Sequence, residues 1–191
     1  MLEQYGGWPT LLSELCDGEN LTSEKTELVL SEILTGEVDP SQISAFLIAL
    51  KVKGETTEEI IGLVRAMLNA SEPLSLPENS IDIVGTGGSL QRREAALNVS
   101  TMASFVAAAS GAVVCKHGNR RASSTSGAFD LLDALGLPVD QTPLEVAEQV
   151  KSKNLGFAFA KTFHPAMRFA GPVRAGIGVP TVFNILGPLS H

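Results

Sequence analysis

IDIVGTGGSLQRREAALNVSTMASFVAAASGAVVCKHGNRRASSTSGA, residues 81–128, is the stretch that decides the fold. It holds two glycine-bearing loops, GTGG at 85–88 and KHGNR at 116–120. Each follows a short apolar run and precedes a segment rich in Ser, Thr and Ala. This is a strand–loop–helix unit used twice. Because glycine lets backbone N–H groups approach a ligand and a helix N-terminus carries partial positive charge, both loops favour an anion. We expect them at the carboxyl ends of parallel strands, where open α/β sheets bind ligands.

Charge is distributed unevenly along the chain. The whole sequence has 14 Lys+Arg against 21 Asp+Glu, a net charge of -7. Between residues 89 and 128 the balance reverses, and a single acid, Glu94, faces the basic side chains Arg92, Arg93, Lys116, Arg120 and Arg121. A basic cluster within an acidic protein indicates a small anionic ligand, and it argues against nucleic acid, which favours a broad basic face.

Composition limits the class of protein. A hydrophobic content of 44% in 191 residues indicates a folded core. No apolar run reaches the length of a membrane span, and the start MLEQYGGWPT does not resemble a secretory signal. The two cysteines, Cys16 and Cys115, make no disulfide framework or CxxC pair. We therefore expect a cytoplasmic protein with no membrane partner.

The first part of the chain predicts helices. Apolar residues recur at helical spacing between residues 8 and 70, and Thr22 or Ser23, Asp39 before Pro40, and Thr56 are candidate helix starts. We predict a helical domain over 1–72, to which residues 163–178 return. Leu11, Leu12 and Leu15 fit either its core or a surface for a second copy.

The second part alternates strands and helices. Apolar strands are expected at 81–84, 112–115 and 155–160, with helices near 100–110, 126–135, 142–151 and 163–174, and a strand or turn at 180–186. This order predicts a mainly parallel-sheet α/β domain over 77–162 and 179–191. Prolines Pro73 and Pro77 mark the link between the domains.

Each motif also has a simpler structural interpretation. GTGG is neither GxGxxG nor a Walker A loop, so alone it fits a tight turn as well as an anion site. Residues 98–101 fit ordinary helix capping, and His117 fits a hydrogen-bonding histidine better than a metal ligand. KHGNR with Ser123 and Ser124 nearby favours the ligand interpretation, because a structural turn has no need of so many donors.

These motifs together resemble the anthranilate phosphoribosyltransferase family. ILTG at 33–36, QISAFL at 42–47 and KGET at 53–56 are similar to its helical domain. KHGNR with ASS at 122–124 is similar to its most specific motif. FHPAM at 163–167, PVR at 172–174 and TVFNILGPL at 181–189 resemble its later signatures.

The resemblance implies a reaction. The amine of anthranilate attacks C1 of phosphoribosyl pyrophosphate (PRPP), and pyrophosphate leaves with the assistance of Mg2+. An aniline nitrogen is largely unprotonated at neutral pH, so the reaction requires positioning and charge stabilisation and no strong general base, and we assign no catalytic side chain. The resemblance also implies a homodimer formed through the helical domain.

The same resemblance implies the site residues. Ser100 would coordinate Mg2+. The residues that would contact anthranilate are Gly85, Asn119, His164, Met167, Arg174 and Pro188. Arg174 would pair with the anthranilate carboxylate. PRPP would be met by Gly85, Thr86, Gly87, Gly88, Ser89, Asn98, Val99, Ser100, Thr101, Lys116, His117, Gly118, Asn119, Arg120, Arg121, Ala122, Ser123, Ser124 and Ala128.

The chain departs from the family pattern in its first loop and in its extent. Ser89 stands where the family has Asp, and Ala95 or Ala96 replaces a threonine of the family. The loop before Asn98 is also longer than in the family. We expect Arg92 and Arg93 to supply phosphate contacts in this loop. Family members continue past the last residue here, and an adjacent Asp–Glu pair that holds Mg2+ lies in that later part. We therefore expect the 191 residues alone to lack full activity.

Two other functions fit parts of the sequence. A pyrimidine or thymidine phosphorylase shares the helical and α/β architecture, but the GTGG and KHGNR segments are similar to the transferase. A non-catalytic paralogue that binds nucleic acid or a regulatory partner is suggested by Ser89 and the missing metal pair. The net charge of -7 opposes nucleic acid.

Overall fold

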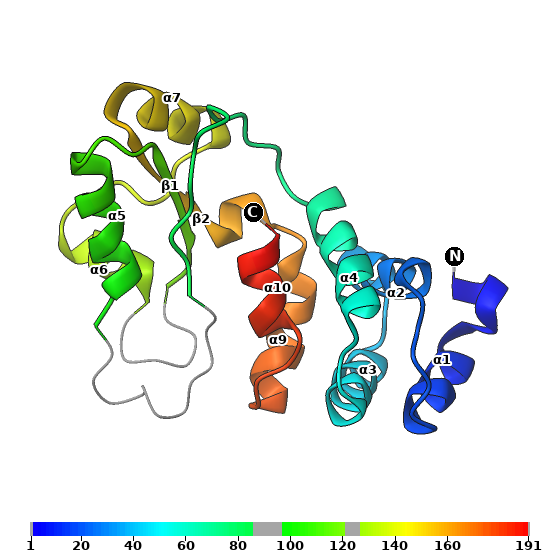
Figure 1. Ribbon diagram of the computed structural model, residues 1–191. Coiled ribbons are helices and arrows are strands. Elements are labelled where there is room, and N and C mark those ends of the chain that lie inside the picture. Colours follow the sequence, from blue (N-terminus) through cyan, green and yellow to red (C-terminus); the bar gives the residue numbers. More distant parts are fainter. Residues whose placement is uncertain (1, 86–96, 121–126, 191) are drawn as a thin grey trace. The chain divides into compact units, whose positions relative to one another are not determined.

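The computed structural model describes residues 2–85, 97–120 and 127–190 (Figure 1). The chain forms two compact units, residues 1–71 with 166–191 and residues 72–165. In the described ranges, no helix combines the length and apolar character needed to cross a membrane. The predicted class, a helical part and a parallel α/β part, is confirmed.

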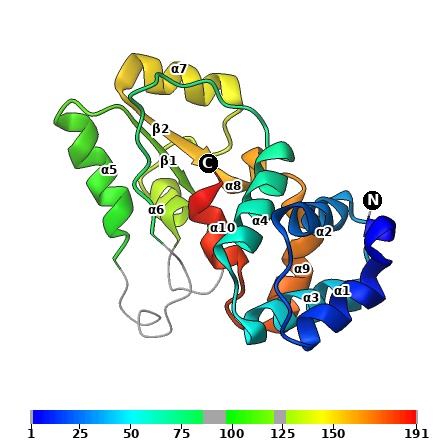
Figure 2. The ribbon, with the colours of Figure 1, turned by 45° about the vertical axis from the view of Figure 1, so that its right-hand side comes forward.

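The first unit is entirely helical. Its elements are the 3-10 helix η1 (Leu2–Tyr5) and the helices α1 (Gly7–Cys16), α2 (Ser23–Thr35), α3 (Pro40–Lys53), α4 (Thr57–Asn69), α9 (Met167–Ile177) and α10 (Phe183–Leu189). Figure 2 shows α2 and α4 side by side. Side chains from all the longer helices share one apolar core, which includes Leu11, Phe46, Leu63 and Phe183.

Local sequence signals set the helix boundaries in this unit. Thr22 accepts a hydrogen bond from the Lys25 backbone, and Asp39 accepts one from the Ser41 backbone. Thr56 and Glu59 form a capping box in which each side chain bonds the other's backbone N–H. These three starts were predicted from the sequence and are confirmed.

The structure decides one open alternative in the first unit and corrects one prediction. Leu11 and Leu15 are 0% and 2% exposed, so of the two alternatives they belong to the core and offer no surface to a second copy. Residues 180–186 were expected as a strand or turn of the α/β domain. In the structure the helix α10 occupies residues 183–189, because Phe183 and Leu186, three residues apart, both pack into the helical core.

The second unit is built on a parallel strand pair. Strand β1 (Val114–Gly118) pairs with β2 (Leu155–Phe159), with Val114 opposite Leu155 and Gly118 opposite Phe159. The strand expected at 81–84 is reduced to one bridge between Ile81 and Val114. The helices are α5 (Val99–Ala109), α6 (Ala128–Ala134), α7 (Pro143–Lys153) and α8 (Ala160–Phe163).

Alternation along the strands gives this unit two small cores. Cys115 and Ala158 pack with Val146 and Val150 of α7 on one face. Phe157 and Phe159 pack with Phe129 and Leu132 of α6, and with Phe105 of α5, on the other. Helices therefore cover both faces of the strand pair, as expected for parallel strands.

Candidate active site

Three segments of the second unit end at the same edge. In Figures 1 and 2 the carboxyl end of β1, the N-terminus of α5 and the end of residues 81–85 all run to one edge of this unit. The described phosphate residues Gly85, 98–101 and 116–120 lie on these segments or directly next to them. The arrangement places a helix N-terminus beside the carboxyl end of a strand, which is the geometry of anion sites in α/β proteins.

Lys116 is a buried cation at this edge. It was expected in a loop, but it lies inside β1 and is 2% exposed. Its ammonium donates to the backbone oxygens of Ile83, at 2.7 Å, and His117, at 3.2 Å. Burial lowers its pKa, which the charge of Asp82 partly offsets by raising it. The bond to Ile83 also fixes the chain two residues before Gly85.

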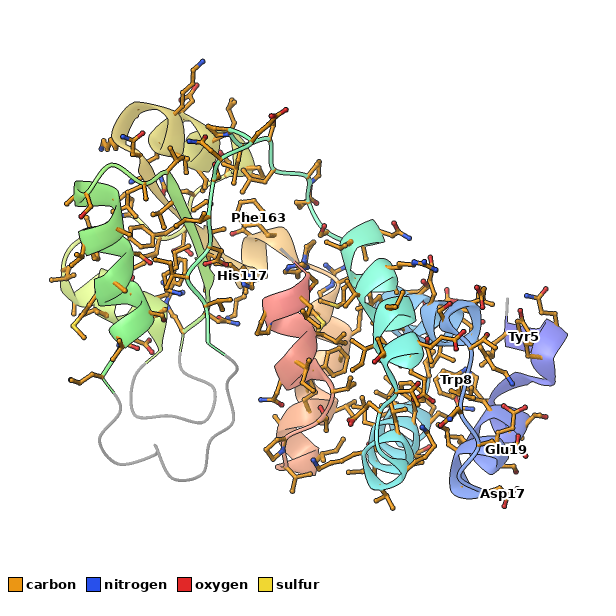
Figure 3. All side chains as sticks on the ribbon, viewed as in Figure 1. Tyr5, Trp8, Asp17, Glu19, His117 and Phe163 are labelled. Carbon is orange, nitrogen blue, oxygen red and sulfur yellow. The ribbon has the colours of Figure 1, made fainter. Side chains whose placement is uncertain are left out.

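His117 and His164 meet in the structure. His117 follows Lys116 on β1 (Figure 3), and its side chain is buried at 8% exposure. The ring of His164, which follows α8 and is also 8% exposed, lies edge-on to it with centroids 5.6 Å apart. The short helix α8 follows β2 directly and ends at Phe163, and His164 is its C-cap residue. Sequence reasoning had assigned the two histidines to different substrates.

The end of β1 packs closely on α6. A Cβ added to Gly118 would lie 3.1 Å from the Cβ of Ala128, which is a tight contact, so glycine lets the two segments pack closely. The Asn119 carbonyl accepts a hydrogen bond from the backbone of Phe129, and the Asn119 side chain accepts one from the Arg120 backbone. Three predicted phosphate residues, Gly118, Asn119 and Ala128, are therefore brought together.

The first turn of α5 presents hydroxyl groups. Asn98 is its N-cap residue, and its side chain makes no capping hydrogen bond. Ser100 is half-buried. Thr101 is fully buried, and its hydroxyl has no hydrogen-bond partner among the residues that the structure describes. A buried polar atom without a partner is costly, which favours a ligand at this helix end.

The remaining predicted contacts of anthranilate belong to the first unit. Met167 and Arg174 lie on α9, and Pro188 lies on α10. The Arg174 guanidinium lies 4.8 Å from the centroid of the Phe183 ring, and burial lowers its pKa. Over the described ranges, no carboxylate forms an ion pair with it. Arg174 is thus a partly buried cation available to an acidic group.

Several predicted residues lie outside the described ranges. These are the rest of the first loop with its two arginines and the residues after KHGNR: Thr86, Gly87, Gly88, Ser89, Arg92, Arg93, Ala95, Ala96, Arg121, Ala122, Ser123 and Ser124. Gly85, the last described residue before them, is exposed, and Val99 at the start of α5 is exposed as well.

The residues that sequence reasoning missed are acidic. Asp82 raises the pKa of both Cys115 and Lys116 through its charge, and the only sequence signal was a carboxylate in an otherwise apolar strand. Asp133 and Asp140 form ion pairs with Arg120, and nothing in the sequence indicated them.

Comparison with known proteins also divides the chain into a helical part and an α/β part. Residues 9–71 match the helical bundle domain of the glycosyl transferase family, and residues 77–191 match the a/b domain of that family. Anthranilate phosphoribosyltransferase from Rhodococcus jostii is 49% identical over 184 residues, 96% of this chain and 50% of the relative. The enzyme of that name from Saccharopolyspora erythraea is 47% identical, over 97% of this chain and 52% of the relative.

Solved structures give the same result. Anthranilate phosphoribosyltransferase from Thermus thermophilus superposes with a TM-score of 0.87 at 45% identity, covering 94% of this chain and 54% of that one. The Saccharomyces cerevisiae enzyme in complex with PRPP and Mg gives 0.86 at 32% identity, covering 97% and 55%. The chain spans about half the length of the relatives it matches. By its a/b domain, which accounts for more than half of the chain, and by its helical bundle, the protein belongs to the glycosyl transferase family.

Proposed function

We propose that the protein transfers the phosphoribosyl group of PRPP to anthranilate in tryptophan biosynthesis, giving N-(5-phosphoribosyl)anthranilate and pyrophosphate. The observation that carries the proposal is the buried Lys116 ammonium on β1, a strand whose carboxyl end runs to the same edge of the second unit as the N-terminus of α5 (Figure 1). The printed names of the relatives support the substrates, and one similar structure holds PRPP and Mg.

Lys116 and the first turn of α5 would bind the phosphates. The ammonium supplies a charge in a site from which water is largely excluded, so its attraction for a phosphate exceeds that of an exposed lysine. The Thr101 hydroxyl and the free N–H groups of α5 supply neutral donors. The segments 86–89 and 121–124, which the resemblance also implies, would complete the site.

Anthranilate would be held by groups from both parts of the sequence. Arg174 would pair with its carboxylate, for which the planar guanidinium is suited. Asn119 and His164 would contact the ring or the amine, with Gly85, Met167 and Pro188 along its path. The chain would accelerate the reaction by holding the amine in line with C1, since no strong base is needed.

Mg2+ fits this site as an ion that is held mainly by the phosphates of PRPP. The described residues contain no group of three or more His, Cys, Asp or Glu side chains that could hold an ion. Ser100 offers one half-buried hydroxyl, and Mg2+ commonly takes its other ligands from phosphates and water. The ion would neutralise charge on the leaving pyrophosphate.

The resemblance also supports a cytoplasmic homodimer. Because Leu11 and Leu15 are buried, we look for the dimer contact on another surface of the helical unit. Ile48 and Val52 on α3 are 36% and 81% exposed and lie one helical turn apart. Light scattering of the wild type and of Val52→Glu would test this surface, and a monomeric wild type would refute the dimer.

The test of the function is calorimetric titration with PRPP and Mg2+, on these 191 residues and on the product of the full gene. Binding followed by pyrophosphate release with anthranilate supports the proposal. Phosphate-dependent cleavage of a pyrimidine nucleoside would favour the phosphorylase. If neither form binds PRPP, the proposal fails and the non-catalytic paralogue takes its place.

A further inference from the structure

Arg120 is held by three different segments of the second unit. Its Nε donates to Asp133 Oδ2 at 2.9 Å and its Nη2 donates to Asp133 Oδ1 at 3.4 Å, which is a two-point contact. Nη2 also lies 3.7 Å from Asp140 Oδ2. The guanidinium lies 4.9 Å from the centroid of the Phe159 ring. These partners belong to α6, to the segment after α6 and to the end of β2.

Arg120 lies next to the residues that are expected to contact phosphate. Arg120 directly follows Asn119, and its backbone N–H donates to the Asn119 side chain at 2.8 Å. Phe159 stacks on Phe129, with centroids 4.8 Å apart, and is the register partner of Gly118. The Arg120 side chain therefore ties the end of β1 to the same aromatic pair on which Gly118 packs.

The charges around Arg120 argue against a direct contact with phosphate. Two carboxylates face its guanidinium, and the hydrogen bonds to Asp133 raise its pKa. A phosphate at the same guanidinium would approach the Asp133 carboxylate, and like charges repel. A bidentate contact also uses two donors in the fixed plane of the fork. Lys116, by contrast, has no ion pair among the residues described.

We propose that Arg120 is a positioning residue: through Asp133 and Phe159 it fixes the segment 116–119, and it does not itself bind phosphate. This assigns Arg120 a different role from the phosphate contact that the KHGNR motif suggests, and it rests on the proposed function only for the identity of the ligand. Asp133 shares this positioning role through its contact with Arg120, although it touches no substrate.

The substitution Asp133→Asn separates the two roles. If Arg120 positions the segment, Arg120→Ala and Asp133→Asn each weaken PRPP binding by about tenfold to a hundredfold, as a misplaced contact does. The double variant is then no weaker than the worse single one, because both changes break the same contact. If Arg120 is a phosphate ligand, Asp133→Asn leaves PRPP binding unchanged or tightens it, since it frees the guanidinium. That result would overturn the proposal.

Calorimetric titration of the full gene product with PRPP and Mg2+ is the measurement, and Asp17→Asn is the matched control. Asp17 is an exposed aspartate in the first unit, and its substitution is expected to leave the affinity unchanged. Thermal melting of each variant shows whether it folds.

Hydrogen exchange gives a second readout that needs no ligand. We expect the amides of residues 117–119 to exchange faster in both Arg120→Ala and Asp133→Asn, while those of α7 keep their wild-type rates. Unchanged exchange at 117–119 would refute the positioning role. If the wild type fails to bind PRPP, the proposed function fails, and this comparison still decides the role of Arg120.

Discussion

Lys53 Nζ donates to Glu59 Oε2 at 2.9 Å, and the two side chains are only 5% and 0% exposed. The same carboxylate accepts hydrogen bonds from the backbone N–H groups of Leu21 and Thr56 and from the Thr56 hydroxyl. Glu59 thus joins the link before α2, the end of α3 and the start of α4.

Replacing Glu59 is expected to destabilise the helical unit strongly. Glu59→Gln leaves Lys53 without its counter-charge in a buried site, and breaking such a pair costs about 3–5 kcal/mol. The free energy of unfolding from urea titration measures the loss. Glu145→Gln is the matched control, because Glu145 forms the same capping box with Thr142 at the exposed start of α7. Equal losses in the two variants would contradict the role of burial.

Glu59 also predicts how stability depends on pH. Burial raises its pKa, but the hydrogen bonds from Leu21, Thr56 and Lys53 together lower it, and the net shift is downward. The unfolded chain then binds the proton more tightly than the folded one. Stability is retained above the unfolded pKa of about 4.3 and is lost as the pH falls through the folded pKa. Acid unfolding curves of wild type and Glu59→Gln should therefore converge below that range, and parallel curves would refute it.

A methyl group at Gly36 is expected to cost more than backbone strain alone. Gly36 ends α2 at φ +87, and an added Cβ would overlap the Phe169 ring. Gly178 ends α9 at φ +70 with nothing within 4 Å. Gly178→Ala should cost about 1–2 kcal/mol, the strain of a left-handed residue. Gly36→Ala should cost more, and Phe169→Leu should recover part of the excess, both measured by denaturant titration. Equal costs at both positions would show that the ring yields freely.

The buried amine of Lys116 predicts an early loss of PRPP binding in alkali. Since burial lowers its pKa, the charge is lost as the pH rises through a value below the usual 10.4. Calorimetric titration with PRPP between pH 7 and pH 10 should show affinity falling over this range. Lys116→Met should bind weakly at every pH. A Met variant with wild-type affinity would exclude Lys116 from the phosphate site.

The two thiols are expected to differ in reactivity. Cys16 is exposed, whereas Cys115 is buried and its pKa is raised to about 12 by burial and by the charge of Asp82. Because the thiolate is the reactive form, one thiol should react quickly with a disulfide reagent in the folded protein, and both after denaturation. Cys16→Ser should abolish the fast phase. A fast phase that persists would place Cys115 in contact with solvent.

Short-range signals in the sequence were enough to predict much of the fold. Thr22, Asp39 and Thr56 mark helix starts because capping depends on residues two or three positions apart. The segment 180–186 misled prediction, because a run of β-branched and apolar residues suits a strand as well as a helix. Its packing against α4, more than 100 residues earlier, decided the outcome.

The candidate site was predictable in its residue types and not in its contacts. The KHGNR motif indicated an anion site, and the structure puts Lys116 and His117 inside β1. The acidic partners of Arg120 are 13 and 20 positions away along the chain, and no periodic pattern joins them. Long-range pairs of this kind depend on the tertiary fold.

The helical unit is interrupted in the sequence, and this has a consequence for synthesis on the ribosome. Helices α9 and α10 complete a core whose other helices lie before residue 72, with the whole second unit encoded in between. At ~5–20 residues per second, α1–α4 wait seconds for their partners. The continuous second unit emerges and can fold first. Nascent chains that end at residue 165 and are tethered to the ribosome by a linker that clears the exit tunnel should therefore hold a protease-sensitive helical segment and a protected α/β unit.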